Sequence, residues 1–101
     1  MILELSDDAQ VDLQQIADYT FDNWGEEHEE VYLKRIYAKL EDIQGSPDRW
    51  RYRKELHPDC QCALVGSHVI FFCIDEVTLK VARILHQSMD FEIHLRDELF
   101  E

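Results

Sequence analysis

Apolar residues recur with two different periods along this chain. "ILELS", residues 2–6, alternates over a short run, which predicts a strand. After it, apolar residues return every three or four positions, which predicts two successive helices. The first inner stripe is Ala9, Leu13, Ile16, Ala17, Thr20 and Trp24, and the second is Leu33, Ile36, Leu40 and Ile43.

Capping and breaking residues set the predicted limits of these helices. Ser6 is a favourable N-cap for the first helix. Gly25 breaks it, and the spacing of Asn23 and Glu26 resembles a capping box for the second. Gly45-Ser46-Pro47 ends that second helix. Two helices joined this tightly form an antiparallel hairpin.

The second half of the chain predicts strands joined by tight turns. "VIFFCI", residues 69–74, lacks alternation, which indicates a central strand covered by the helices on at least one face. The expected turns are Gly66-Ser67 and Asp75-Glu76. Residues 46–58 read as a loop, and the strands are expected at 60–65, 68–74 and 77–86. The prediction is one α+β domain over residues 1–101, of order β-α-α-β-β-β, with a helical hairpin on a mostly antiparallel sheet.

The net charge of −12 changes the range of partners to expect. Non-specific nucleic-acid binding depends on many Lys and Arg side chains, and this chain has 10 against 22 acids. Residues 1–48 carry 13 acids and 3 bases, whereas "RWRYRK", residues 49–54, holds four bases. This run is either a solvated loop or a loop that binds a protein partner.

The cysteines, histidines and apolar runs of the sequence bear on metal binding and on membrane insertion. "HPDCQC", residues 57–62, offers one C-x-C pair without the second pair that structural zinc needs, so we expect buried thiols and no metal or cofactor. No apolar run is long enough to span a membrane, and the N-terminus does not resemble a signal peptide. These features predict a cytoplasmic protein with free thiols.

Several short segments, in their order along the sequence, resemble the ParE branch of the ParE/RelE toxin superfamily. These segments run from residue 3 to about residue 90, and "GSHVIFF" followed by "RILHQSMD" is the most specific part. They are Leu5-Ser6, Ala9, Asp12-Leu13, Ile16-Ala17-Asp18-Tyr19, Trp24-Gly25-Glu26-Glu27, Tyr32-Leu33, Ser46-Pro47, Gly66–Phe72 and Arg83–Asp90.

This resemblance implies a toxin of a type II toxin–antitoxin system, of the kind that stabilises plasmids. Such a toxin binds the A subunit of DNA gyrase and inhibits gyrase by this binding rather than by catalysis. A ParD-like antitoxin neutralises it in a hetero-oligomer, and its flexible C-terminal part wraps across the toxin's helices and sheet. The C-terminal part carries toxicity in the family, which makes Arg83, His86, Gln87, Ser88, Met89 and Asp90 the candidate gyrase contacts.

The antitoxin contacts are expected elsewhere. The basic run supplies the candidates Arg49, Trp50, Arg51, Arg53 and Lys54, which would take an acidic stretch of antitoxin. The acidic helices predict that the antitoxin segment contacting them is rich in Lys and Arg.

Several departures from the family leave alternatives open. "CQCAL", residues 60–64, replaces a basic-aromatic strand, and Gln87 replaces a basic residue. "FEIHLRDELFE", residues 91–101, predicts a short acidic helix that could cover the candidate surface. The alternatives are a RelE-like ribosome-dependent mRNA endonuclease, for which the strands carry few bases, and a degenerate homologue that only binds antitoxin.

Four side chains carry a structural interpretation beside the functional one. Arg83 could pair with an acid on a helix, and His86 could be half-buried and bonded to a backbone carbonyl. Trp24 is expected to anchor the tip of the hairpin, whereas Trp50 is less easily placed in a core.

Overall fold

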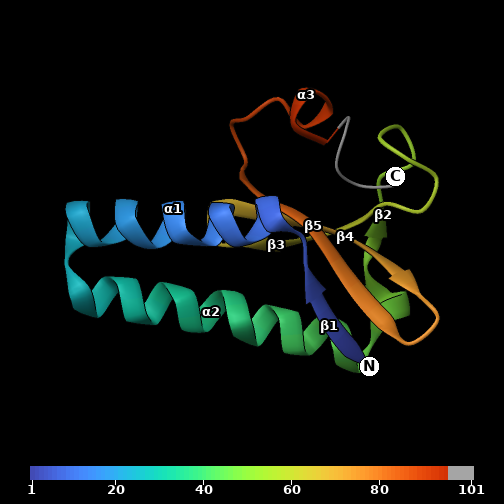
Figure 1. Cartoon of the computed structure of the whole chain (residues 1–101), viewed down its shortest axis with the longest axis horizontal. Coiled ribbons are helices and arrows are strands. Elements are labelled where there is room, and N and C mark those ends of the chain that lie inside the picture. The colour runs from blue at the N-terminus through green and yellow to red at the C-terminus, as the bar shows by residue number, and fades with distance from the viewer. Residues whose placement is uncertain (96–101) are drawn as a thin grey trace.

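The computed structural model describes residues 1–95, and its elements follow the predicted order (Figure 1). A 3₁₀ turn and a two-residue strand are added to that order, and the predicted short C-terminal helix is present from Phe91. The elements are β1 (Ile2–Leu5), α1 (Asp7–Trp24), α2 (Glu26–Gly45), the 3₁₀ turn η1 (Pro47–Arg49), β2 (Arg51–Tyr52), β3 (Gln61–Val65), β4 (His68–Asp75), β5 (Thr78–His86) and α3 (Phe91–Leu95).

Within the described residues the strands form one five-stranded sheet of order β1-β5-β4-β3-β2. β1 runs parallel to β5, and the other neighbours are antiparallel, which confirms the predicted fold class. The expected loop at 46–58 is wrong in part, because Arg51 and Tyr52 pair with β3. Two residues are too few to show a strand period, so only the neighbouring strand identifies them.

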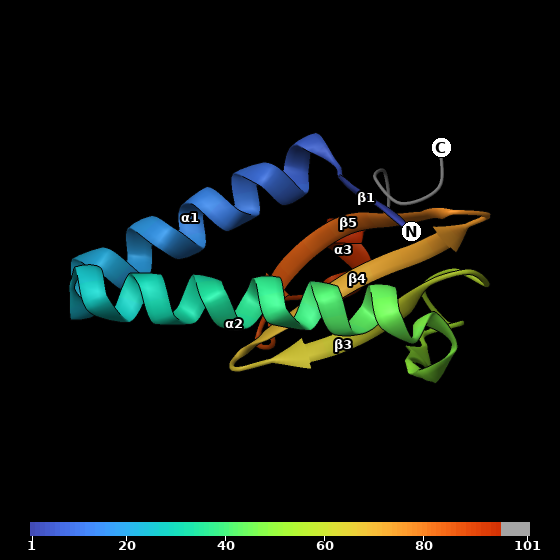
Figure 2. The same cartoon turned by 90° about the horizontal axis from the view of Figure 1, so that it is seen from below.

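The helical hairpin covers one face of the sheet and extends beyond the ends of the strands (Figures 1 and 2). Ser6 caps α1 as expected, since its Oγ accepts from the Ala9 N–H at 2.9 Å. The capping box is wrong: Gly25 is the N-cap of α2 and has a positive φ, so no side chain caps that helix. The Asn23 amide instead donates to the carbonyl of Tyr19.

Two cores form because β3 and β4 are buried on both faces. Ile70 and Phe72 point into the main core beneath the hairpin, which includes the N-terminal half of the predicted α1 stripe, up to Ile16, and the α2 stripe. Val69 and Phe71 point to the opposite face, where Leu95 of α3 closes a smaller core. β4 therefore lacks alternation because it is a central strand covered by the helical hairpin, as predicted, and because its other face is buried as well. The remainder of the predicted C-terminal helix, residues 96–101, lies outside the described residues.

β5 contains a bulge at Ala82. Phe71 faces Arg83 across the ladder, whereas Phe72 faces Val81, so Ala82 has no opposite residue on β4. The extra residue allows both Val81 and Ile84 to enter the main core, although they are three positions apart. The bulge also turns Arg83 toward α1, at the start of the candidate gyrase contacts.

The two hairpin turns of the sheet have left-handed residues. Gly66 (φ 57°) joins β3 to β4, as expected. The second turn is one residue later than predicted: β4 continues to Asp75, and Glu76 (φ 53°) and Val77 make the connection. Within residues 1–95, no helix is long and apolar enough to cross a bilayer.

Candidate functional site

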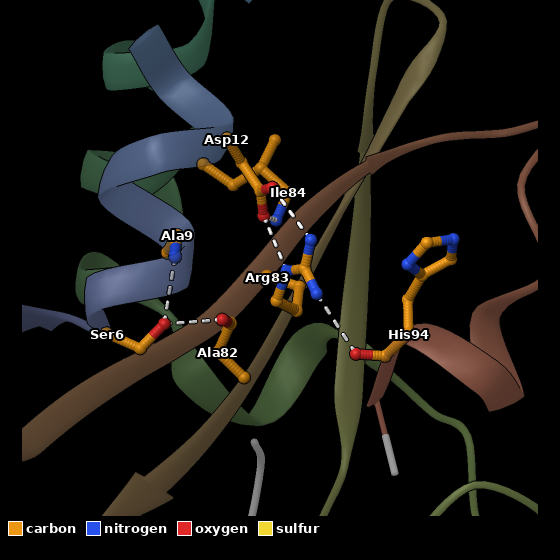
Figure 3. A network of polar contacts seen from close by, with 7 residues as sticks. All are labelled: Ser6, Ala9, Asp12, Ala82, Arg83, Ile84 and His94. Carbon is orange, nitrogen blue, oxygen red and sulfur yellow. Dashed lines mark hydrogen bonds and ion pairs between the residues drawn. The ribbon is translucent and has the colours of Figure 1, made fainter. Parts of the chain in front are cut away.

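The edge of β5 lacks a strand neighbour beyond the point where β1 ends, as far as residues 1–95 show. Leu5 pairs with Val81, and the chain then turns into α1. The polar edge is satisfied by side chains instead: Ser6 Oγ donates to the carbonyl of Ala82 at 2.6 Å, and Asp12 Oδ2 accepts from the Ile84 N–H at 2.9 Å (Figure 3). Two side chains thereby replace the missing ladder bonds.

Arg83 is fixed by the same carboxylate. Its Nε and Nη2 donate to both oxygens of Asp12 at 2.8 and 2.9 Å, and its Nη1 donates to the carbonyl of His94 at 3.1 Å (Figure 3). The Asp12 side chain is 6% exposed and that of Arg83 15%. This bidentate, largely buried pair joins α1, β5 and α3. The structure therefore bears out the pairing of Arg83 with an acid on a helix.

The other candidate gyrase contacts form an ordered surface loop, residues 86–90. The His86 carbonyl accepts from the Met89 N–H at 3.0 Å, and the Gln87 N–H donates to Ser67 at 2.9 Å. The Asp90 carboxylate and carbonyl accept from amides of α3. All five side chains of the loop are exposed.

The structural interpretation of His86 is wrong. Its ring is exposed, with Nδ1 accepting from the Ser88 N–H at 3.1 Å and lying 2.8 Å from Ser88 Oγ. Within residues 1–95, the His86 ring makes no hydrogen bond to the backbone carbonyl that was expected as its partner. A serine two positions away offers two polar groups, which makes the local contact easier to form.

A cleft of about 840 Å³ opens between the overhanging hairpin and the end of β5. We call it the hairpin cleft. It brings four of the six gyrase candidates together, namely Arg83, His86, Ser88 and Met89, while Gln87 lines a different cavity. The remaining lining residues are Asp12, Gln15, Ile16, Tyr19, Thr20, Trp24, His28, Val31, Tyr32, Arg35, Ser67, His68, Ile84, Leu85 and His94.

Trp24 does not anchor the hairpin tip in a core, contrary to the expectation. It is 58% exposed and contacts Tyr19 edge-on, with ring centroids 5.7 Å apart. The reason is that the hairpin extends past the sheet, so the last turn of α1 has no strand beneath it (Figure 2).

A polar chain crosses the cleft wall from α2 to β5. Tyr32 Oη lies 2.6 Å from His68 Nδ1 and accepts from the Ser67 N–H at 3.2 Å. The His68 ring meets the His86 ring edge-on at 5.4 Å. Burial, and then the nearby His86, lower the pKa of His68 below its usual range, which favours the neutral ring.

The candidate antitoxin contacts form a second surface, the basic patch, defined as residues 49–54. Lys39 and Arg49 lie over the Trp50 ring at 5.3 and 4.5 Å from its centroid. A cavity of about 460 Å³ adjoins it, lined in part by Trp50, Arg51 and Arg53. Trp50 also packs against the main core, and its buried Nε1 has no hydrogen-bond partner within residues 1–95.

The three thiols are buried and free, as expected. Burial, with Cys62 nearby, raises the pKa of Cys60 to about 12, and burial also raises the pKa values of Cys62 and Cys73. A protonated thiol is a poor nucleophile and a poor metal ligand. In the described part of the chain, no three His, Cys, Asp or Glu side chains are grouped so that they could hold a metal ion.

Sequence reasoning assigned no role to several residues of the cleft, above all Asp12, His28 and Tyr32. A signal for Asp12 was present: it stands three residues after Ala9 and four before Ile16, so an acid lies on the buried stripe of α1. His28 and Tyr32 gave no such signal, because their role depends on how far the hairpin overhangs the sheet.

Comparisons with known proteins agree on one family. Residues 3–91 match the model of the family described as the ParE toxin of the type II toxin–antitoxin system, parDE. The chain is 35% identical over 92 residues to Toxin ParE1 of Mycobacterium tuberculosis and 33% identical over 91 residues to Toxin ParE1 of Caulobacter vibrioides. Each match covers 90% of this chain and 94% of the relative.

A solved structure shares the fold. It is described as the chromosomal ParDE TA system from P. aeruginosa, and it superposes with a TM-score of 0.74 at 18% sequence identity. The likeness covers 85% of this chain and 95% of the other.

Proposed function

Because the chain belongs to the ParE toxin family of type II toxin–antitoxin systems, we propose that it arrests growth by binding DNA gyrase through loop 86–90. The observation that carries the proposal is an exposed loop held in one conformation at the end of a buried strand. Its amides and carbonyls are bonded to each other, to Ser67 and to α3. A preorganised loop loses little entropy on binding.

Arg83 has a positioning role in this proposal rather than a contact role. Its guanidinium is bonded to Asp12 of α1 and to the His94 carbonyl of α3. Arg83 therefore links β5 to α3, the two elements between which the loop runs. His86, Gln87, Ser88, Met89 and Asp90 remain the residues that would meet the A subunit of gyrase.

The basic patch is the proposed contact for an acidic stretch of a ParD-like antitoxin, in a cytoplasmic hetero-oligomer. Its cations are displayed on aromatic rings at the surface: Arg49 on Trp50, Arg53 on Phe91 and Lys54 on Tyr52. Arg49, Arg51 and Lys54 are exposed, so an acidic partner can reach them. The patch is also where the chain concentrates its positive charge.

The proposal excludes catalysis by this chain. A RelE-like endonuclease needs cations on the sheet to stabilise phosphoryl transfer. In residues 55–95, the cations on strands are Lys80, which pairs with Asp75 at 3.1 Å, and Arg83, which pairs with Asp12. Both are engaged with carboxylates, which favours binding over RNA cleavage.

Expression with and without the neighbouring antitoxin gene tests the proposal. We expect growth arrest without the antitoxin, loss of gyrase supercoiling activity in extracts, and intact messages. A triple variant of the loop, His86→Ala, Gln87→Ala and Met89→Ala, should abolish the arrest, whereas Val77→Ala in the opposite turn should keep it. Message cleavage would instead indicate an endonuclease, and normal growth would indicate a homologue that only binds antitoxin.

A further inference from the structure

Four of the five histidines of the chain line the hairpin cleft. They come from four elements: His28 from α2, His68 from β4, His86 from β5 and His94 from α3. The fifth, His57, lies in the loop between β2 and β3. The fold therefore concentrates the residue type whose charge changes near neutral pH at one place.

No uncompensated negative charge from residues 1–95 lines this cleft, although the chain carries −12. Among the described residues, its lining contains a single carboxylate, Asp12, and both Asp12 oxygens bind Arg83 while one also accepts from Ile84. The exposed Arg35 of α2 adds a cation to the wall. The cleft is thus a local positive-leaning region in an acidic protein.

Large apolar side chains are exposed around the same cleft. Tyr19, Trp24 and Val31 on the overhanging hairpin are 61%, 58% and 55% exposed, and Met89 on the opposite side is 37% exposed. Aromatic and methionine side chains gathered at one concave surface are typical of protein docking sites.

We propose that the hairpin cleft is a proton-linked docking surface for an apolar partner segment that carries carboxylates. Charge complementarity selects this occupant: the Lys- and Arg-rich segment expected on the acidic outer faces of the helices would, inside this cleft, meet Arg35 and imidazoles instead of acids. The inference rests on the proposed function, in which the chain is held by a partner protein, and it names the chemistry and the regulation of one contact.

The linkage has a definite sign. A carboxylate placed beside an imidazole favours the protonated ring, so the complex holds more protons than the free proteins and binding tightens as the pH falls. His28 and His86 are exposed and can meet the partner directly. His68 contributes less, since Tyr32 Oη engages its Nδ1 and burial lowers its pKa. Within residues 1–95, the charged and titratable groups that line the cleft are Asp12 on α1, His28 and Arg35 on α2, His68 on β4, Arg83 and His86 on β5, and His94 on α3.

Two synthetic amphipathic peptides provide the probe for the full-length protein. They share their apolar positions and differ only in flanking residues, which are Glu in one and Lys in the other. We expect the Glu peptide to bind several-fold more tightly at about pH 6 than at about pH 8, because imidazoles beside its carboxylates are protonated at the lower pH. The Lys peptide should bind more weakly and gain nothing, and circular dichroism should show the same fold at both pH values.

Matched variants locate the effect. The double variant His28→Gln and His86→Gln should remove the gain in affinity at low pH, whereas His57→Gln should keep it. The inference would be overturned if both peptides bound equally or if the affinity did not depend on pH. It would also be overturned if the two variants had equal effects, or if neither peptide bound at millimolar concentration. A toxic chain with such a result would lose only this inference, and a non-toxic chain with proton-linked binding would lose only the proposed gyrase function.

Discussion

Asp12 connects α1 to the edge of β5 through its carboxylate. It binds Arg83 in a bidentate pair and accepts from the edge amide of Ile84, and it is 6% exposed. Removing one partner of a buried pair leaves the other charge uncompensated, which costs more than the pair itself contributes.

The first prediction concerns that pair. Asp12→Asn keeps the shape and an oxygen for Ile84 but leaves the largely buried Arg83 guanidinium without its counter-charge. We expect the free energy of unfolding, measured in urea, to fall by about 3 kcal/mol. Asp75→Asn, which breaks the exposed pair with Lys80, is the control and should change stability little. Equal losses in the two variants would contradict the structural role of Asp12.

The turn at Gly66 gives a second prediction. A Cβ at this position would lie 2.6 Å from Tyr32 Oη and 2.7 Å from its Cε1, and φ is +57°. Gly66→Ala should therefore reduce the free energy of unfolding by about 2 kcal/mol, from left-handed strain and displacement of Tyr32. Gly45→Ala, with nothing within 4 Å of its added Cβ, should have no such cost. A Gly66→Ala protein as stable as the parent would show that Tyr32 moves freely.

At the scale of elements, α3 decides how loop 86–90 is held. The helix has five residues, too few to be stable alone, so it depends on contacts with the sheet. Phe91 packs on Phe71 with ring centroids 4.8 Å apart, and Arg53 lies over the Phe91 ring at 5.6 Å. The loop is therefore fixed at one end by β5 and at the other by this packing.

A third prediction follows for α3. Phe91→Ala should lower the free energy of unfolding by about 2 kcal/mol and speed hydrogen exchange at the Met89 amide, which bonds to His86 within the loop. Ile93→Ala lies in the same helix but is 64% exposed, so it should change neither quantity appreciably. If Phe91→Ala destabilised the protein without faster exchange at Met89, the loop would be held by β5 alone.

At the scale of the molecule, a protein of net charge −12 carries two separate surfaces that favour negatively charged partners, the basic patch and the hairpin cleft. The basic patch is positive at any pH near neutral because its charges are Arg and Lys, whereas the hairpin cleft depends on histidines. Attraction between a charged patch and its partner acts mainly on the rate of association and weakens with salt.

The fourth prediction uses that dependence. Changing Arg49, Arg51, Arg53 and Lys54 together to Gln should slow association with a ParD-like antitoxin about tenfold at low salt, and less as salt is raised. Stopped-flow mixing at several salt concentrations measures the effect. A variant with Lys34→Gln and Lys80→Gln, cations outside the patch, should associate at nearly the parent rate. Unchanged rates in the quadruple variant would remove the patch from the antitoxin interface.

The sequence by itself determined the elements and their order. Its periods placed the stripe of α2 and that of α1 except for Trp24, and Ser6 marked the first cap. Gly66 marked the turn, and the unbroken apolar run of β4 indicated a central strand covered on at least one face. These features are local, because a period, a cap or a left-handed glycine acts on neighbouring residues. The resemblance in "GSHVIFF" and "RILHQSMD" added the family, which the comparisons confirm.

Tertiary structure alone decided which distant residues meet. The bulge at Ala82 and the end of β1 at Leu5 brought Asp12 to Arg83, 71 positions away. The reach of the hairpin past the sheet left Trp24 exposed and gathered His28, His68, His86 and His94 into one cleft. Such contacts depend on strand register and on the relative lengths of elements, which no local period encodes.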